Sequence, residues 1–336
     1  MSVDRVLYGI RDLVVEYRTR VGTLSPVDHV SFDIQRGEVL GLVGESGCGK
    51  TTLGKALMRM IEPPGVIASG QLLFDGVDLM QLSGRRMREL RGSRISMIFQ
   101  DPMTSLNPVQ RVVDHMTETI RVHQPSTSLK AARARASELV DRLGIRQSSL
   151  GDYPHQLSGG MRQRVMIGLA LALRADLVIA DEATTSLDVL VEAQFLDLLR
   201  ELQAEFELTI VLITHNIGIV AELADRVAVM YAGQLVEMAE VHDLFRDPKH
   251  PYTQGLLRAV PNIRLGRDDL YKMPGSPPNL IAPPRGCRFN PRCPQVMDIC
   301  RVRDPAFELV TPGRRVHCWL YQDQPEIVSE KVQARL

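Results

Sequence analysis

The stretch "GLVGESGCGKTTLGKAL", Gly41 to Leu57, decides the fold of this chain. Its centre, Gly44 to Thr51, fits the pattern G-x-x-x-x-G-K-[ST], in which backbone N–H groups surround phosphate oxygens. An apolar run precedes the pattern and apolar residues at helical spacing follow it, so it lies where a strand turns into a helix. That position argues against a chance match in a glycine-rich turn. The stretch therefore predicts a phosphate-binding loop.

Each part of this loop has a chemical role. Its glycines let the backbone fold around phosphate, Lys50 reaches the β- and γ-phosphates, and Thr51 offers a hydroxyl to magnesium. Cys48 occupies a variable place in the pattern, and we expect no chemistry from its thiol. The nucleotide-binding residues expected here are Gly44, Glu45, Ser46, Gly47, Cys48, Gly49, Lys50, Thr51 and Thr52.

Short apolar runs alternate with helical segments along the first three quarters of the chain. Strands are expected at residues 13–17, 30–34, 38–44, 70–76, 176–182 and 208–215, and a helix at 50–61 before Pro63 and Pro64. Such alternation predicts an α/β fold with a mostly parallel sheet covered on both faces. We expect one domain over residues 1–255, with a helical subdomain inserted at about 103–172.

Charge and hydropathy exclude several classes of protein. Forty Lys and Arg residues balance forty Asp and Glu residues, so the chain lacks the strongly positive field of most nucleic-acid binders. The opening "MSVDRVLYGIRDL" does not read as a signal peptide, and no segment approaches about 18 uninterrupted apolar residues. We therefore expect a soluble intracellular protein without a nucleic-acid partner.

Two further motifs complete a nucleotide site. The apolar run "LVIADE" delivers Asp181 to the magnesium side and Glu182 to a water that attacks phosphate. In "LSGGMRQR", Ser158, Gly159 and Gly160 open a helix whose first N–H groups form a second anion site. Alone, the first motif could be a solvated strand end and the second an ordinary helix N-cap. Together with the phosphate loop they suggest a γ-phosphate held from two sides.

In order, the phosphate loop, Gln100, "LSGGMRQR", "VIADE", "SLD" and His215 resemble the full motif series of an ABC-type ATPase subunit. The resemblance implies a P-loop nucleotide-binding domain with a RecA-like core, an N-terminal antiparallel β-subdomain and a helical subdomain. It also implies a dimer that binds Mg²⁺-ATP between the phosphate loop of one subunit and the "LSGGMRQR" stretch, called the signature segment, of the other. Family members commonly have proline after the catalytic glutamate, whereas this chain has Ala183; both carboxylates are intact, so hydrolysis is still expected.

By resemblance, Tyr17 stacks on adenine, Gln100 senses magnesium and touches the membrane partner, and His215 contacts the γ-phosphate. Each has a plainer alternative, as a cover for a strand edge, a strand-terminal amide and a structural histidine respectively. Residues implied in contact with the partner subunit's ATP are Leu157, Ser158, Gly159, Gly160, Met161, Arg162 and Gln163. The implied dimer seam is Ser186, Leu187 and Asp188, the magnesium set is Thr51, Gln100 and Asp181, and the catalytic set is Lys50, Glu182 and His215.

Four other stretches narrow the resemblance to bacterial importers of the oligopeptide, dipeptide and nickel class. They are "QDPMTSLNP" (100–108), "YPHQLSGGMRQRVMI" (153–167), "HPYTQGLL" (250–257) and "GCRFNPRCP" (286–294). The class implies a second, non-identical ATPase subunit, two membrane permease subunits and an extracytoplasmic solute-binding protein. The chain would lie on the cytoplasmic face of the bacterial inner membrane. Peptides are the expected solute, with nickel or oligosaccharides as alternatives.

The C-terminal extension, residues 256–336, is rich in proline and arginine and contains Cys287, Cys293, Cys300 and Cys318. We expect a loop-rich region that needs a crosslink to become ordered. The cysteine spacing lacks the short pairs of structural zinc sites, yet four thiolates suit a tetrahedral zinc or a [4Fe–4S] cluster. Resemblance to peptide importers favours the cluster, and four reduced structural thiols are the alternative.

These motifs predict an ATP-hydrolysing subunit that energises an ABC importer. A soluble ABC ATPase in DNA repair, translation or iron–sulfur assembly is the first alternative. An iron–sulfur sensor with an ancillary ATPase is the second. A single cassette without excess positive charge disfavours the nucleic-acid roles.

Overall fold

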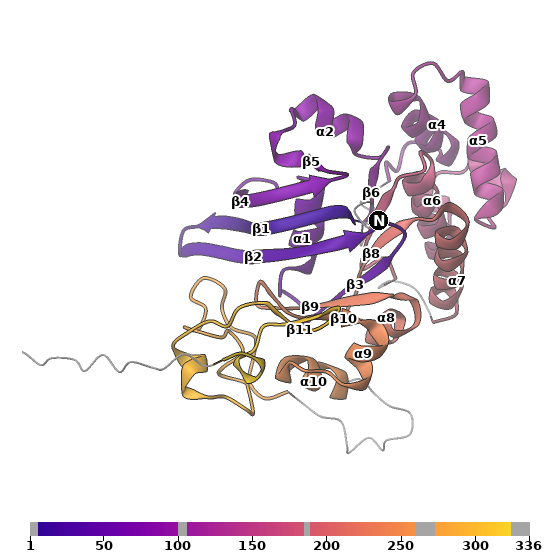
Figure 1. Cartoon of the computed structure of the whole chain (residues 1–336). Helices are drawn as coiled ribbons and strands as arrows, with labels where there is room; N and C mark the ends of the chain where they lie inside the picture. Colours follow the sequence, from indigo (N-terminus) through magenta and orange to yellow (C-terminus); the bar gives the residue numbers. More distant parts are fainter. Residues whose placement is uncertain (1–5, 100–105, 185–188, 260–272, 324–336) are drawn as a thin grey trace, which may run out of the picture.

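The computed structural model describes residues 6–99, 106–184, 189–259 and 273–323, which build two sheets (Figure 1). The smaller sheet has four antiparallel strands in the order β2-β1-β4-β5. Its strands are β1 (Val6–Thr19), β2 (Gly22–Gln35), β4 (Gly65–Phe74) and β5 (Val77–Asp78). The antiparallel N-terminal subdomain expected from the motif series is therefore present.

The larger sheet has eight strands in the order β11-β12-β10-β9-β3-β8-β7-β6. They are β3 (Val39–Val43), β6 (Ile95–Ile98), β7 (Leu177–Asp181), β8 (Thr209–Ile213), β9 (Arg226–Tyr231), β10 (Gln234–Glu240), β11 (Glu308–Thr311) and β12 (Arg314–Val316). From β6 to β9 all neighbours are parallel, and the remaining pairs are antiparallel. β3, β7 and β8 are buried along their whole length, as expected for apolar runs at the centre of a parallel sheet.

Helix α1 (Lys50–Leu57) packs between the two sheets. Its buried Leu53 and Leu57 share one apolar cluster with residues of β1, β2, β3 and β8. The helix ends four residues earlier than the sequence predicts. Arg59 has a left-handed backbone (φ 51°), and the amide N–H groups of Met58 and Met60 both bond to the Lys55 carbonyl, which closes the helix before the two prolines.

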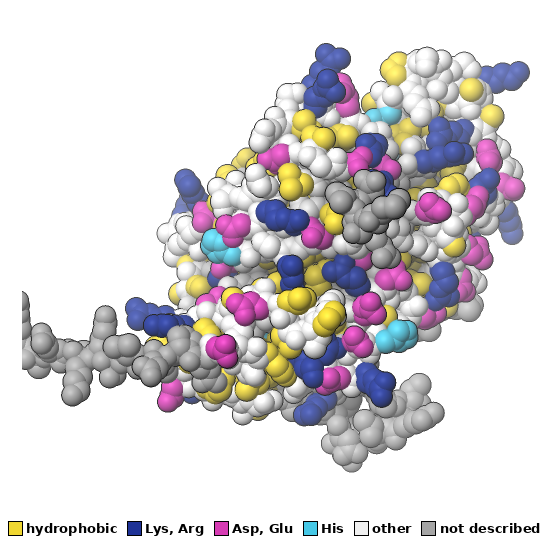
Figure 2. Space-filling view, in the orientation of Figure 1, with side chains coloured by type: hydrophobic (Ala, Val, Ile, Leu, Met, Phe, Trp, Pro, Cys, Tyr) yellow, Lys and Arg dark blue, Asp and Glu magenta, His cyan; other side chains and the backbone are white. Residues whose placement is uncertain are grey.

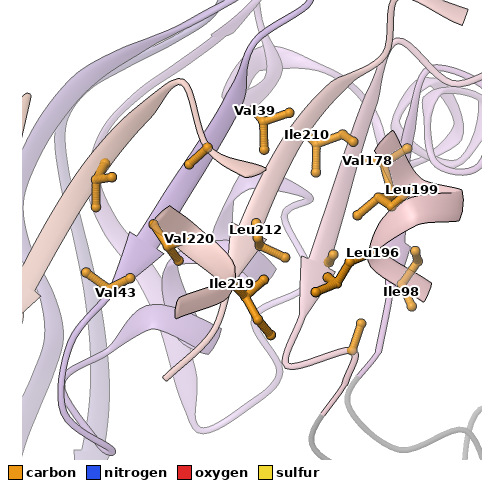
Figure 3. Close-up of a cluster of buried hydrophobic side chains, with 14 of the residues drawn as sticks. Val39, Val43, Ile98, Val178, Leu196, Leu199, Ile210, Leu212, Ile219 and Val220 are labelled. Atoms are coloured by element: carbon orange, nitrogen blue, oxygen red, sulfur yellow. The ribbon is translucent and has the colours of Figure 1, made fainter. Parts of the chain in front are cut away.

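The other face of the larger sheet is covered by helices. They are α6 (Gly159–Leu171), α7 (Val189–Phe206), α8 (Ile217–Leu223), α9 (Val241–Arg246) and α10 (Pro251–Arg258). Figure 3 shows Leu196 and Leu199 of α7 and Ile219 and Val220 of α8 lying over aliphatic side chains of the sheet. This second apolar cluster completes the α/β fold, with helices on both faces of the parallel strands as expected.

Between β6 and β7 the chain forms a helical part, at the upper right of Figure 1. It contains α4 (Val112–His123), α5 (Leu129–Arg142) and the start of α6. α5 begins at an N-cap in which the Ser128 hydroxyl accepts a hydrogen bond from the Ala131 amide at 3.2 Å. A further short helix, α2 (Gly84–Leu90), precedes β6. No helix among the described residues is long and apolar enough to cross a membrane.

The extension is loop-rich where the structure describes it, with short 3-10 helices at Asp298–Arg301 and Trp319–Tyr321. The sequence analysis missed its two strands, because β11 and β12 have only four and three residues and no clear alternation. β12 pairs with β10, where Val316 lies opposite Glu237, so the extension prolongs the main sheet. Phe289 of the extension packs edge-on against Tyr231 and Tyr252, at ring distances of 5.2 and 5.5 Å.

Candidate nucleotide-binding site

The phosphate loop joins β3 to α1 in a conformation that requires glycine. Gly44 and Gly49 have φ values of +154° and +111°. A Cβ atom at Gly44 would lie 2.1 Å from the Met230 carbonyl oxygen, and one at Gly49 would lie 1.8 Å from the Pro26 carbonyl oxygen. The loop is therefore packed so closely against β9 and β2 that no other residue fits at these two positions.

Lys50 is folded back over the loop. Its Nζ donates hydrogen bonds to the carbonyl oxygens of Gly44 (2.8 Å) and Glu45 (3.1 Å), and the residue is only 5% exposed. These bonds hold a buried positive charge beside the first N–H groups of α1. Both the charge and the helix N-terminus favour an anion at this place.

A hydroxyl and a carboxylate meet at the other side of the loop. Thr51 Oγ1 donates to Asp181 Oδ1 at 3.0 Å, which joins α1 to the end of β7. Asp181 is 2% exposed. Burial, and to a smaller degree the Glu182 charge, raise the pKa of Asp181, whereas the Thr51 bond lowers it. This pair of hard oxygen donors, with a carboxylate that lacks full charge compensation, fits a Mg²⁺ ion.

Glu182 and His215 lie together because β7 and β8 are parallel neighbours whose carboxyl ends reach the same edge. The Glu182 backbone is left-handed (φ 47°), and its amide donates to the Ile213 carbonyl at 2.8 Å. His215 Nδ1 lies 3.6 Å from Glu182 Oε1, and the two side chains are 55% and 16% exposed. His215 is thus not a buried structural histidine; its ring faces a carboxylate at the site.

Lys50, Thr51 and Glu182 border a cavity of about 480 Å³. Its wall is formed by Tyr17, Leu24, Pro26, Ser46, Gly47, Gly49, Lys50, Thr51, Thr52, Glu182 and Leu280. One part of the wall is the phosphate loop, and another part is apolar and comes from the β1–β2 hairpin, where Tyr17 lies opposite Leu24. The cavity thus joins a phosphate-binding region to a surface suited to an aromatic base.

Sequence reasoning missed three residues that support this site. The Tyr252 hydroxyl accepts a hydrogen bond from the Glu45 amide at 2.8 Å, and Arg292 binds the Glu45 carboxylate at 2.7 and 2.9 Å. Leu280 lines the cavity. Tyr252 and Arg292 lie in "HPYTQGLL" and "GCRFNPRCP", which the sequence analysis used only for classification. No local pattern indicated that either residue reaches a loop more than 200 positions away.

The signature segment forms the start of α6. The Ser158 hydroxyl caps the helix by accepting from the Met161 amide at 3.3 Å, and Ser158 and Gly159 are exposed. Leu157 and Gln163 are buried in their own chain, at 4% and 2% exposure. Their side chains therefore pack inside this subunit and are not exposed for contact with a partner's ATP. The expected residues Gln100, Ser186, Leu187 and Asp188 lie outside the described residues.

None of the four extension cysteines forms a disulfide, and three of them are buried. Within the described ranges, which include all four, no group of three or more His, Cys, Asp or Glu side chains is arranged to hold a metal. The expected ready-made metal site is therefore not found. Burial first, then the charges of Asp304, Cys318 and Cys300, raise the pKa of Cys287 to about 12.

Comparisons with known proteins agree with this geometry. The ABC transporter family model matches residues 27–185, and the model of the oligopeptide/dipeptide transporter C-terminal region matches residues 236–300. The chain is 44% identical over 325 residues to the dipeptide transport ATP-binding protein DppD of Bacillus subtilis, covering 96% of both chains. It is 45% identical to DppD of Escherichia coli, covering 93% of this chain and 96% of that one.

Solved structures show the same fold. The dimeric bacterial ABC transporter cassette MJ0796 superposes with a TM-score of 0.63 at 24% identity, over 70% of this chain and 98% of that one. The cbiO1 component of a Clostridium perfringens ABC transporter gives 0.61 at 28% identity, over 72% and 92%. With full-length relatives above 40% identity and an intact phosphate loop, the chain belongs to the family of ATP-binding, ATP-hydrolysing subunits of dipeptide and oligopeptide ABC transporters.

Proposed function

We propose that this subunit hydrolyses ATP to energise the import of peptides through a membrane permease. The observation that carries the proposal is a cavity lined by Lys50, Thr51 and Glu182, with Asp181 bonded to Thr51 and His215 beside Glu182, in a chain that also has the peptide-transporter C-terminal region. Relatives named for dipeptide and oligopeptide transport support the solute class. Nickel or an oligosaccharide would be the alternative solutes.

In this proposal each residue has a defined task. Lys50 and the loop amides bind the triphosphate, and Tyr17 stacks on the base. Thr51 and Asp181 hold Mg²⁺, which would neutralise charge on the β- and γ-phosphates. Glu182 accepts the proton of the attacking water, and His215, 3.6 Å from that carboxylate, orients it and faces the γ-phosphate.

The proposed working unit is a dimer with a second ABC ATPase subunit. Ser158 and Gly159 are exposed at the N-terminus of α6 and do not line the cavity of this chain's own phosphate loop, so they are free to bind the partner's ATP. Gln100 and residues 186–188 belong to the same proposal, at the permease contact and the dimer seam. Two permease subunits and an extracytoplasmic binding protein complete the importer, with this subunit on the cytoplasmic face of the membrane.

The division into an ABC domain, residues 1–255, and an extension, residues 256–336, is also part of the proposal.

The alternative function, a soluble ABC ATPase in DNA repair or translation, finds little support in the distribution of surface charge. Figure 2 shows Lys and Arg side chains interspersed with Asp and Glu over the visible face, without a continuous basic patch there. A face of mixed charge gives no strong electrostatic attraction to a nucleic-acid backbone.

Steady-state ATPase activity of Glu182→Gln tests the catalytic assignment. The variant keeps the size of the side chain but cannot accept the water's proton, so turnover should fall at least about 100-fold while ATP binding stays within about threefold. Glu201→Gln, on the exposed side of α7, is the matched control and should be unchanged. Turnover near that of the native enzyme would refute the role of Glu182.

Purification from native membranes tests the transport assignment. A permease should co-purify with the subunit, and deletion of the subunit should abolish uptake of a labelled dipeptide that wild-type cells accumulate. Recovery without any integral membrane protein, or dipeptide uptake that does not depend on this chain, would contradict the proposal. If the transporter takes up nickel but no dipeptide, the ATPase assignment stands and the assigned solute changes from peptide to nickel.

We further propose that Cys287, Cys293, Cys300 and Cys318 bind a [4Fe–4S] cluster, with zinc as the alternative. Support comes from the donor set, because four cysteine thiolates are the usual ligands of a [4Fe–4S] cluster, and three of these four side chains are buried. The Cys287 amide also donates to the Cys300 carbonyl at 2.9 Å. Protein purified without oxygen should contain about four iron and four sulfide per chain. One zinc without sulfide would select the alternative, and no metal would refute both.

A further inference from the structure

The C-terminal extension contacts the ATP site at two places, although the family's ATP-binding motifs all lie before residue 216. One contact is ionic and lies behind the phosphate loop. The other is apolar and lies on the cavity wall. We propose that the extension is a working part of this ATP site: Arg292 holds the phosphate loop in its binding conformation, and Leu280 forms a wall for the nucleoside.

Arg292 is a buried guanidinium with several hydrogen bonds. Its two terminal nitrogens donate to the two Glu45 carboxylate oxygens at 2.7 and 2.9 Å, and its Nε donates to the Pro274 carbonyl at 2.8 Å. The side chain is 5% exposed, and its carbon Cζ lies 5.8 Å from the centre of the Tyr231 ring. A bidentate, charge-assisted pair in this setting is strong and has a fixed geometry.

Glu45 passes this restraint to the phosphate-binding groups. It is the second residue of the loop pattern, its amide donates to the Tyr252 hydroxyl, and its carbonyl accepts from Lys50 Nζ at 3.1 Å. The side chain is thus tied to the extension, the amide to α10 and the carbonyl to the phosphate-binding lysine. Without Arg292 the Glu45 carboxylate would lose its fixed partner, and the loop would sample conformations that do not bind phosphate.

A second arginine fixes the extension to the same region. Arg288 bonds to the Asp28 carboxylate and to the Ala232 carbonyl. The neighbouring residue Gly233 donates its amide to the carbonyl of Cys48, inside the phosphate loop, at 2.9 Å. Arg292 therefore anchors the extension to the phosphate loop itself, and Arg288 anchors it to two segments that pack beside the loop.

Leu280 lies at the apolar end of the cavity. It shares the cavity wall with Tyr17 and Leu24, and the next residue, Ile281, packs against the β1–β2 turn, where a Cβ atom at Gly22 would be 2.5 Å from Ile281 Cγ2. That turn is the hairpin that carries Tyr17. Leu280 therefore faces the part of the cavity suited to a base and sugar, whereas Arg292 acts on the phosphate end.

Fluorescent ATP-analogue binding and competition by tripolyphosphate separate the two contacts in the full-length protein. Arg292→Leu should raise the Kd of both ATP and tripolyphosphate about tenfold, as expected if the binding-competent loop falls to about a tenth of the population. Leu280→Ala should raise the Kd of ATP about fivefold through lost apolar contact and leave that of tripolyphosphate unchanged. Arg301→Leu, an exposed extension arginine beside a cysteine, is the control and should match the native protein.

A double-mutant cycle distinguishes positioning from general support of the fold. If Arg292 acts through Glu45, the double variant Arg292→Leu/Glu45→Gln should bind ATP no more weakly than the weaker single variant. In the assembled transporter, Arg292→Leu should raise KM for ATP and keep kcat within about twofold, because saturating nucleotide restores the loop. Additive losses, or a reduced kcat with unchanged KM, would overturn the inference.

Arg292→Lys covers the case in which the leucine variant does not fold. Lysine keeps the charge but cannot make the bidentate contact, so the Kd should lie between those of the native and leucine proteins. If Arg292→Lys binds ATP with the same Kd as the native protein, the bidentate contact of Arg292 does not hold the loop. If Leu280→Ala raises the Kd of ATP and of tripolyphosphate equally, Leu280 does not act on the nucleoside.

Discussion

Replacing Gly49 by alanine should destabilise the nucleotide-free protein far more than the same change at Gly47, two residues earlier. Both residues have left-handed backbones, with φ of +111° and +78°, which cost alanine roughly 1–2 kcal/mol. At Gly47 a Cβ atom meets nothing within 4 Å. At Gly49 it lies 1.8 Å from the Pro26 carbonyl oxygen, so the loop and β2 must separate by roughly 1 Å to reach the 3.0 Å that real contacts keep.

To make this room the backbone at Gly49 must shift, which breaks two hydrogen bonds accepted by carbonyls of the loop. The Leu53 amide bonds to the Gly49 carbonyl and the Gly233 amide to the Cys48 carbonyl, both at 2.9 Å. Each contributes about 1 kcal/mol. Gly49→Ala should therefore lower the free energy of unfolding by about 3–4 kcal/mol, and Gly47→Ala by about 1–2 kcal/mol.

Urea unfolding of both variants, followed by far-ultraviolet circular dichroism without nucleotide, measures the difference. The midpoint of Gly49→Ala should lie clearly below that of Gly47→Ala at similar slope. If the two variants differ by less than about 0.5 kcal/mol, the close packing of the loop on β2 is not what makes Gly49 necessary.

Three other changes have defined outcomes. Burial lowers the pKa of His250 to about 3. Between pH 6.5 and pH 3 only the unfolded chain binds a proton at this histidine, so the free energy of unfolding falls as the pH is lowered through this range. His250→Asn keeps an acceptor for the Tyr252 amide and should flatten this fall when unfolding is measured as a function of pH. Tyr17→Ala should weaken ATP binding about tenfold and Tyr17→Phe by less than twofold, measured by titration; equal losses would refute stacking. Phe289→Ala should cost about 3–5 kcal/mol in urea unfolding, and a cost below about 1 kcal/mol would mean that the extension is not docked through this ring.

The ATP site was predictable because its motifs combine local turns with strand ends. The pattern from Gly44 to Thr51 dictates a tight turn at a helix N-terminus, and the run ending in Asp181 and Glu182 must be a central strand. Parallel neighbours then bring His215 to the same sheet edge. The meeting of Thr51 with Asp181 and of Glu182 with His215 follows from this topology, which the motif order already indicated.

The extension was much harder to predict. β11 and β12 are too short to leave a periodic signal, and β12, which pairs with β11, also pairs with β10, a neighbour more than 70 positions earlier. The four cysteines predicted a zinc or [4Fe–4S] site, whereas no group of three or more His, Cys, Asp or Glu side chains among the described residues is arranged to hold a metal. Spacing alone says nothing about the directions in which thiols point, because loops without periodicity leave those directions to packing.

The sequence by itself determined the phosphate loop, the order of the nucleotide-site motifs and the α/β class, since each leaves a signal in residues close along the chain. Only the tertiary structure showed that Arg292 binds Glu45, that Tyr252 supports the same loop and that Leu280 enters the cavity wall. Such contacts join segments more than 200 residues apart. They depend on how the extension docks on β9, β10 and α10, where the buried rings of Tyr231, Tyr252 and Phe289 fix its position.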